Sequence, residues 1–414
     1  MKKSGNNILQ SLINIVISGS KDEKFKLTFN NLSNVDKDKF KEVILHNKLA
    51  ANFIDFIGKN NLESLFDHTF LENCRNQKTR FQVNSLNSIR EVHLLNELFA
   101  KEDLNPIFLK GVALQREYKD IALRPFVDID ILFDKSEILK AYQILHKREF
   151  LDSAETQYIN EKNIEDFCRN FHHISLITKN GISIELHHRI TPVKFFESCP
   201  ITENILINHR KVDFHGKKIN LPSINDLLVH QLCHFSFSDF NGLMRTISDL
   251  RAVTENYEVN FYMILSNLTN EKIIKSLILS LEVINSNGVP IQDLKKVRSG
   301  FGEYCPNDAI ILEAQIKLFS RKKFKGDKFY KNFYRPGKAI DVLAKRLFPH
   351  KSSLIYEYKI SNPNNLIILK TYISHIYKQI VKLKNLPAYL REKYRDANSL
   401  KYTNDTDLWL NGSE

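Results

Sequence analysis

The 414-residue chain contains little glycine, proline and cysteine, with 13, 11 and 5 residues respectively. So few turn-forming residues argue against long flexible linkers and favour a largely helical chain. The five cysteines are scattered, and none belongs to a Cys-x-x-Cys pair, which argues against a zinc site and against a disulfide framework. We therefore expect reduced thiols and a cytoplasmic location.

The chain also lacks a run of about 18 uninterrupted apolar residues, so we expect no transmembrane segment. Two lysines followed by an apolar stretch make the N-terminus faintly similar to a secretory signal. Gln10, Ser11 and Asn14 interrupt that stretch, however, and we expect no signal peptide there.

Positive charge is in excess, with a net charge of +12 at pH 7. This excess favours contact with something anionic, such as a nucleotide, a nucleic acid or a membrane surface, without choosing among them. Basic and aromatic residues concentrate between Lys317 and Lys351, a composition that can bind nucleic acid. A helical pattern over residues 366–394, interrupted by Pro387, could equally lie on an anionic membrane surface. An ordinary solvated helix that packs on the core is the simpler interpretation.

The hydrophobic period divides the chain into helical and strand-forming parts. Apolar residues recur every three or four positions in residues 1–100 and again after Pro222, which is typical of helices. Between these parts the period is two, which predicts short strands at residues 106–109, 126–133, 174–178 and 182–187. Asn180-Gly181 joins the last two as a hairpin turn. These patterns predict an α+β fold, in which a small mixed β-sheet is flanked by extensive helical segments.

The strand at residues 126–133 carries the most informative motif. Asp128 and Asp130 project from the same side of this strand, while the odd positions from Val127 to Phe133 form its buried face. Two carboxylates on one rigid strand can hold Mg²⁺ against the phosphates of a nucleotide. Surface strands often expose alternating acids, so a solvated strand face is the competing interpretation.

Residues on other segments strengthen the interpretation as a site. Lys110-Gly111 ends the preceding strand, where the N–H groups of a following helix would be free to bind phosphate. Arg124 lies just before the acidic strand and could meet phosphate charge. Glu185 supplies a third carboxylate on the polar face of another strand.

The histidines allow weaker interpretations. His187 lies on the same strand face as the third carboxylate, where it either supports the site or is an ordinary polar residue. His172 and His173 show no clear pattern, and a structural role is favoured. His230 and His234 have the spacing of zinc ligands on a helix, but no third ligand is evident, so a packed helix is favoured.

The order of these motifs resembles the uncharacterised nucleotidyltransferase family, a branch of the polymerase-β-like nucleotidyltransferase superfamily. The resemblance rests on Leu109-Lys-Gly111, Tyr118, Leu123-Arg-Pro125, Asp128-Ile-Asp-Ile-Leu132 and Ile184-Glu-Leu-His-His188. Leu232-Cys-His234 and Met244-Arg-Thr-Ile-Ser-Asp-Leu250 are similar to the downstream helical region of that family. The similarity spans residues 85–290 and leaves out the N-terminal region and the C-terminal third.

This resemblance implies roles for the motif residues. Asp128 and Asp130 would bind two Mg²⁺ ions, and Glu185 would complete the site that holds the catalytic metal. Lys110 and Gly111 would cradle the triphosphate of an NTP substrate. The wider superfamily usually has Gly-Ser at this turn, so the Lys-Gly pair would leave phosphate contact to backbone N–H groups and to Lys110.

The implied reaction moves a nucleoside monophosphate from an NTP such as ATP to an acceptor hydroxyl, with release of pyrophosphate. A small molecule, a saccharide, a peptide, a protein or an RNA would each serve as the acceptor. Two alternatives stay open: a phosphotransferase that moves another part of the NTP, and a non-catalytic scaffold that binds RNA or an anionic membrane surface. Arg245 and Asp249, four apart on a helix, form an intrahelical ion pair or, by the resemblance, brace the cleft.

We divide the chain accordingly into four regions. Residues 1–84 form an N-terminal helical region, and residues 85–215 form the nucleotidyltransferase core. Residues 216–300 form a helical domain that completes the cleft, and residues 301–414 form a basic, mainly helical C-terminal region.

Overall fold

A computed structural model of the chain describes residues 5–19, 23–126, 128–147, 159, 161, 164–178, 180–191, 200–238, 240, 242–319, 347–358, 360 and 364–384. Within these residues the fold is α+β, as predicted, with a six-stranded mixed sheet among extensive helices. The strand order is β3-β4-β2-β1-β6-β5, and the strands are β1 (Ile107–Phe108), β2 (Asp128–Leu132), β3 (His173–Ile177), β4 (Ser183–His187), β5 (Arg210–Phe214) and β6 (Lys217–Leu221).

Helices precede, interrupt and follow the strands along the chain. Before and around the first strands they are α1 (Gly5–Ser18), α2 (Glu23–Asn30), α3 (Asn34–His46), α4 (Ala50–Asn60), α5 (His68–Ala100), α6 (Lys110–Gln115), α7 (Ile138–Lys147), α8 (Ile164–Asn170) and α9 (Pro200–Asn208). After the sheet they are α10 (Ile224–Phe237), α11 (Leu243–Asn256), α12 (Phe261–Ser266), α13 (Glu271–Ser286), α14 (Leu294–Gly300), α15 (Asp308–Phe319), α18 (Lys351–Glu357) and α19 (Asn365–Lys384).

All four predicted strands are confirmed, with small shifts at their ends. In β2 and directly after it, Ile129, Ile131 and Phe133 are fully buried, as the alternating pattern predicted, while Val127 lies outside the described residues. β3 and β4 pair antiparallel around Gly181, whose φ of +76° suits a glycine in a tight turn. β4 also pairs with β2, in the parallel direction, so the hairpin joins the sheet beside the acidic strand.

The hairpin β5–β6 is a feature that the sequence analysis missed. Its turn, His215-Gly216, has positive φ at both residues, the backbone of a type I′ turn. β6 pairs parallel with β1, so the sheet continues past residue 215, where the core was predicted to end. Val212 and Ile219 face each other across the hairpin in an alternating pattern, which is the signal that could have revealed it.

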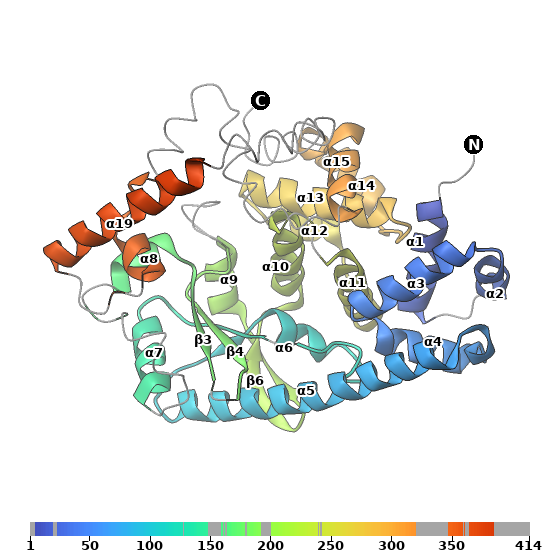
Figure 1. Cartoon of the computed structure of the whole chain (residues 1–414), viewed down its shortest axis with the longest axis horizontal. Helices are drawn as coiled ribbons and strands as arrows, with labels where there is room; N and C mark the ends of the chain where they lie inside the picture. The colour runs from blue at the N-terminus through green and yellow to red at the C-terminus, as the bar shows by residue number, and fades with distance from the viewer. Residues whose placement is uncertain are drawn as a thin grey trace.

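The long helix α5 connects the N-terminal helices with the sheet (Figure 1). Its 33 residues would span about 50 Å at 1.5 Å per residue. Figure 1 shows it running along the lower side of the view, from α4 and the N-terminal helices to the sheet. The helices α10 and α13 pack against each other on the opposite side of the sheet, and α6 lies between α10 and β2.

The predicted helix at Pro222 is confirmed in detail, since the Ser223 side chain caps α10 by accepting a hydrogen bond from the Asp226 N–H. The predicted C-terminal helix appears as α19. Pro387 and most of the basic segment between Lys317 and Lys351 lie outside the described residues. Among the helices that the structure describes, none has both the length and the apolar character needed to cross a membrane.

Gly111 in α6 packs closely against Phe126. A Cβ atom there would lie 2.7 Å from the Cβ of Phe126, a distance that real Cβ contacts do not reach. Since neither atom is the end of a flexible side chain, relief would require a backbone shift. Gly111 is therefore required for α6 to pack beside the segment that leads into β2.

We expect Gly111→Ala to lower the free energy of unfolding by about 1–3 kcal/mol, because overpacking at this contact displaces the backbone. Gly58→Ala in α4 is the matched control, since its nearest neighbour would lie 3.8 Å away, an ordinary contact, and alanine favours a helix over glycine. Urea unfolding of the three proteins measures both effects. Equal stability of Gly111→Ala and the wild type would contradict this account of the packing.

Candidate active site

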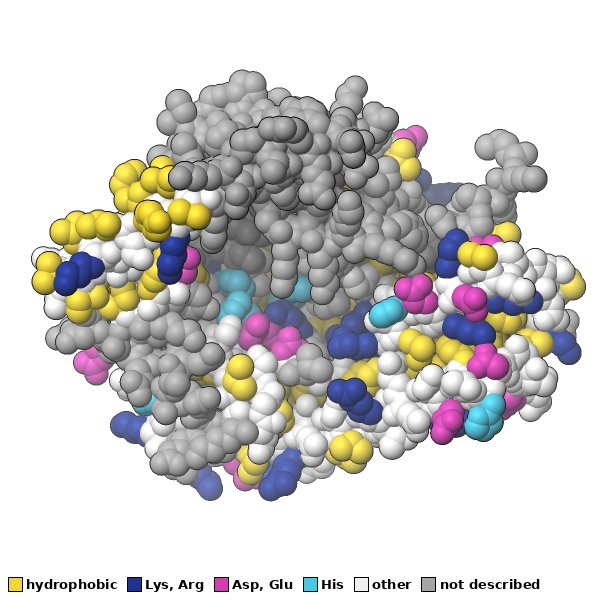
Figure 2. Space-filling model, viewed as in Figure 1, with side chains coloured by type: hydrophobic (Ala, Val, Ile, Leu, Met, Phe, Trp, Pro, Cys, Tyr) yellow, Lys and Arg dark blue, Asp and Glu magenta, His cyan; other side chains and the backbone are white. Residues whose placement is uncertain are grey.

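The pairing of β2 with β4 builds the centre of the site. In this parallel register Asp130 lies directly opposite Glu185, and Asp128 is on the same face of β2 two positions earlier. These carboxylates adjoin a cleft of about 260 Å³. The cleft is lined by Lys110, Asp128, His172, His173, Glu185, Ile190, Thr191, His230, His234, Phe237 and Ser238. In Figure 2 histidine, acidic and basic side chains gather near the middle of the visible face.

Asp130 is the most heavily bonded of the three carboxylates. Its Oδ1 lies 2.7 Å from Nζ of Lys110 and 2.9 Å from Nε2 of His187. The same two donors reach Oε2 of Glu185, at 3.8 Å from Lys110 and 3.2 Å from His187. Oδ2 of Asp130 is buried and has no hydrogen-bond partner among the described residues. One oxygen of Asp130 is thus held by two donors, and the other remains available to a ligand.

The electrostatic surroundings shift the pKa values of Asp128 and Asp130 in opposite directions. Burial, and then the negative charge of Asp130, raise the pKa of Asp128 above its usual value. Burial also opposes ionisation of Asp130, but Lys110 and then His187 outweigh it and hold the pKa of Asp130 well below its usual range. Asp130 is therefore a fixed anion, and Asp128 is the carboxylate that an added cation would stabilise most.

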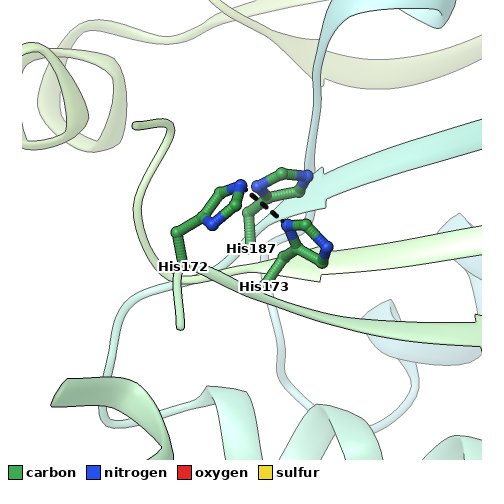
Figure 3. A group of neighbouring side chains, drawn as sticks. All are labelled: His172, His173 and His187. Atoms are coloured by element: carbon green, nitrogen blue, oxygen red, sulfur yellow. Dashed lines mark hydrogen bonds between the residues drawn. The ribbon is translucent and has the colours of Figure 1, made fainter. Parts of the chain in front are cut away.

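Three histidines stand beside these carboxylates. His172 directly precedes β3, His173 begins it, and His187 ends the neighbouring β4. Figure 3 shows their imidazole rings turned toward a common region, with Nδ1 of His173 2.8 Å from Nε2 of His172. Burial is the main cause that lowers the pKa of His172 to about 2 and the pKa of His173 to about 4. Both rings are therefore neutral at pH 7.

Helix α11 braces the chain just before the acidic strand. Oδ1 of Asp249 lies 2.5 Å from Nε of the buried Arg124 and accepts a hydrogen bond from the Tyr118 hydroxyl at 2.8 Å. Arg245, one turn earlier on α11, donates a hydrogen bond to the carbonyl of Pro125. Among the described residues Asp249 thus pairs with a distant segment and does not form the intrahelical ion pair that was one of its two interpretations.

The structure separates the predicted site residues into two groups. Lys110, Asp128 and Glu185 line the cleft, and the buried Asp130 and His187 contact Lys110 and Glu185 respectively. The remaining residues lie in the supporting layer: Arg124, Arg245 and Asp249 form the brace before β2, and Gly111 packs on Phe126. The predicted contacts of Gly111 and Arg124 with phosphate stay predictions.

Four histidines that line the cleft, His172, His173, His230 and His234, were given no favoured site role from the sequence. His172 and His173 had no pattern in the sequence, since only the fold of the β3–β4 hairpin brings them to His187. His230 was interpreted as part of a packed helix, and only 1% of its surface is exposed. Yet neither ring nitrogen of His230 has a hydrogen-bond partner in the described part of the chain.

The donor atoms suit a divalent cation. Asp130, Glu185 and His187 each offer a ligand atom, and these atoms all lie within 4.8 Å of one another. Carboxylate oxygens are the ligands that Mg²⁺ prefers, and the unpartnered Oδ2 of Asp130 is one of them. The ammonium of Lys110 already occupies part of this anionic site, which shows that it accommodates positive charge.

Comparison with known proteins gives one match. Residues 33–287, more than half of the chain, match the model of a family described as uncharacterised nucleotidyltransferase. Searches of curated proteins and of solved structures each found no match.

The two aspartates are expected to respond in opposite directions to neutralisation. Asp130→Asn leaves the ammonium of Lys110 without its nearest anion and weakens the contact with His187, so it should lower the free energy of unfolding by about 3 kcal/mol. Asp128→Asn removes a carboxylate whose charge is disfavoured by burial and by repulsion from Asp130. It should therefore raise the free energy of unfolding. Urea unfolding at neutral pH without divalent cations measures both, and a stabilising Asp130→Asn would refute this assignment of charges.

The brace makes a separate prediction about stability. Asp249→Asn should cost about 3 kcal/mol or more, because it leaves Arg124 buried without a counter-charge. Glu255→Gln on the same helix is the control, since its pair with Arg251 is exposed and should change stability by less than about 1 kcal/mol. Chemical denaturation distinguishes the two, and equal effects would show that the brace contributes no more than a surface pair.

Proposed function

Because the chain belongs to the uncharacterised nucleotidyltransferase family, we propose that it is a Mg²⁺-dependent enzyme that moves a nucleoside monophosphate from an NTP to an acceptor hydroxyl. The observation that carries the proposal is the placement of Asp130 opposite Glu185, with Asp128 on the same face, at a cleft that also contains Lys110. Three carboxylates with one cation suit the binding of a metal and a polyphosphate together.

Asp128, Asp130 and Glu185 are the residues that would hold the metal, and two ions are expected by the resemblance. A bound Mg²⁺ would polarise the acceptor hydroxyl and neutralise charge on the triphosphate. Lys110 is the residue that we expect to contact phosphate, since its ammonium lies at the carboxylates and lines the cleft. His187 orients Asp130 and Glu185 through one nitrogen, which fixes the two carboxylates relative to each other.

The reaction balances as an in-line displacement. The acceptor oxygen forms a bond to the α-phosphorus, while the bond between that phosphorus and the bridging oxygen to the β-phosphate breaks. Pyrophosphate leaves with the electron pair of the broken bond. The proton of the acceptor hydroxyl passes to a carboxylate, for which Glu185 is the better candidate because it lines the cleft, whereas Asp130 is buried and its pKa is held well below its usual range.

The NTP, the acceptor and the location belong to the proposal as well. The acceptor is a small molecule, a saccharide, a peptide, a protein or an RNA with a free hydroxyl. We place the enzyme in the cytoplasm, because Cys74, Cys168 and Cys305 are free thiols.

The alternative function, a non-catalytic scaffold at an anionic surface, draws support from α19. This helix exposes the large apolar side chains of Leu366, Leu369, Ile373 and Tyr377, and Figure 2 shows the apolar patch at the left of the view. Lys370 and Lys378 lie on the same helix and would suit anionic headgroups. The scaffold would bind no NTP at the carboxylates, which separates the two functions.

Calorimetric titration with ATP, GTP, CTP and UTP, with and without Mg²⁺, tests the nucleotide site. We expect Mg²⁺-dependent binding of at least one NTP by the wild type, and its loss in Asp128→Asn and Asp130→Asn. Asp134→Asn is the matched control, because its exposed carboxylate bonds only Ser136 among the described residues and lies outside the cleft lining. It should bind as the wild type does.

Folding of each variant is checked by circular dichroism. A folded wild type that binds none of the four NTPs in the presence of Mg²⁺ would contradict the proposed enzyme and favour the scaffold.

A further inference from the structure

Beside the carboxylates, His172 and His173 line the cleft, and the fully buried His187 lies next to both. Ring centroids of His172 and His173 are 4.1 Å apart, and the His187 ring lies 5.7 Å from the first and 5.0 Å from the second. Ligand nitrogens of the three rings lie within 4.8 Å of one another. They come from the loop before β3, from β3 and from β4, so two paired strands fix them together (Figure 3).

The spacing of these nitrogens is close to that of a tetrahedral metal site. Two nitrogens that each lie about 2.0–2.1 Å from a tetrahedral ion are about 3.3 Å apart. Nδ1 of His173 and Nε2 of His172 are 2.8 Å apart, where one now donates a hydrogen bond to the other. A separation of the rings by about half an ångström would exchange that hydrogen bond for two metal bonds.

The third histidine has the surroundings of a metal ligand. Nε2 of His187 contacts the carboxylates of Asp130 and Glu185, which leaves Nδ1 as the nitrogen for a metal. In the structure the Nδ1–H of His187 donates a long hydrogen bond, 3.3 Å, to the carbonyl of Arg189, so a metal would replace this proton and its hydrogen bond. Metal-bound histidines commonly donate their other ring N–H to a carboxylate, which orients the ring and strengthens the ligand.

A second observation points to a polar occupant of the cleft. His230 from α10 lines the same cleft, is almost fully buried, and has two ring nitrogens without partners among the described residues. Buried polar groups are usually hydrogen-bonded, so an unpartnered imidazole at a cleft wall indicates a bound water or ligand there. A metal ion with a bound water would provide that partner.

We propose that His172, His173 and His187 bind a transition-metal ion of the Zn²⁺ class beside the carboxylate site. Imidazole nitrogens favour Zn²⁺ and related ions over Mg²⁺, whereas carboxylates favour Mg²⁺, so the two groups of side chains select different cations. His230, which lines the same cleft, would hydrogen-bond a water on the metal. The histidine site does not depend on nucleotidyl transfer, and it can be tested without any nucleotide.

Titration of the metal-free full chain with Co²⁺ in excess Mg²⁺ tests the proposal. Mg²⁺ saturates carboxylate sites, and Co²⁺ reports nitrogen ligands by its visible absorption. We expect one Co²⁺ per chain, displaced by Zn²⁺, with affinity at least about tenfold weaker in His172→Ala and in His173→Ala. His46→Ala is the control, since that histidine is exposed on α3 and should leave Co²⁺ binding unchanged.

A second measurement on the wild type keeps the proposal testable if the histidine variants fold poorly. X-ray absorption of the Zn²⁺-loaded chain in excess Mg²⁺ should show at least two imidazole ligands. An oxygen-only coordination shell, displacement of Co²⁺ by Mg²⁺, or wild-type affinity in both folded histidine variants would overturn the histidine site. None of these results would affect Mg²⁺-dependent NTP binding, which fails or succeeds separately.

Discussion

The parallel pairing of β2 with β4 is the constraint on which the rest of the site depends. Because strand side chains alternate, this register alone decides that Asp130 meets Glu185 on one face of the sheet. If one strand slipped by one residue, its carboxylates and its apolar side chains would exchange faces of the sheet. The apolar positions on the other face, Ile129 and Ile184 among them, are fully buried and oppose such a slip. The hydrophobic core thus fixes the position of the charges.

The charges in turn require partners, and the helices supply them. Asp130 is held by Lys110 from the start of α6, while Arg124 just before β2 is held by Asp249 from α11. Buried ions are costly unless they are paired, so each of these pairs fixes the position of a helix against the acidic strand. The helical region after the sheet therefore acts as more than a cover, because α11 sets the path of the chain into β2.

Local sequence patterns predicted the parts of the site that depend on local geometry. Alternation on one strand placed Asp128 and Asp130 on one face, and Asn180-Gly181 predicted the hairpin that carries Glu185. Contacts between distant segments had no such signal. The partner of Arg124 is 125 residues away. The pairing of β3 with β4 brings His172 and His173 to His187, and Asp130 joins them only when β4 pairs with β2. The contact of Arg124 with Asp249 could therefore not be predicted from periodicity.

The central claim is that the nucleoside monophosphate, and not another part of the NTP, is transferred. Its most direct test incubates the enzyme and a set of acceptors with NTP labelled at the α-phosphate or, in parallel, at the γ-phosphate. The account predicts that the α-label and the nucleoside enter the product while the γ-label leaves in pyrophosphate. Entry of the γ-label into the acceptor, with release of nucleoside diphosphate, would contradict it and identify a phosphotransferase.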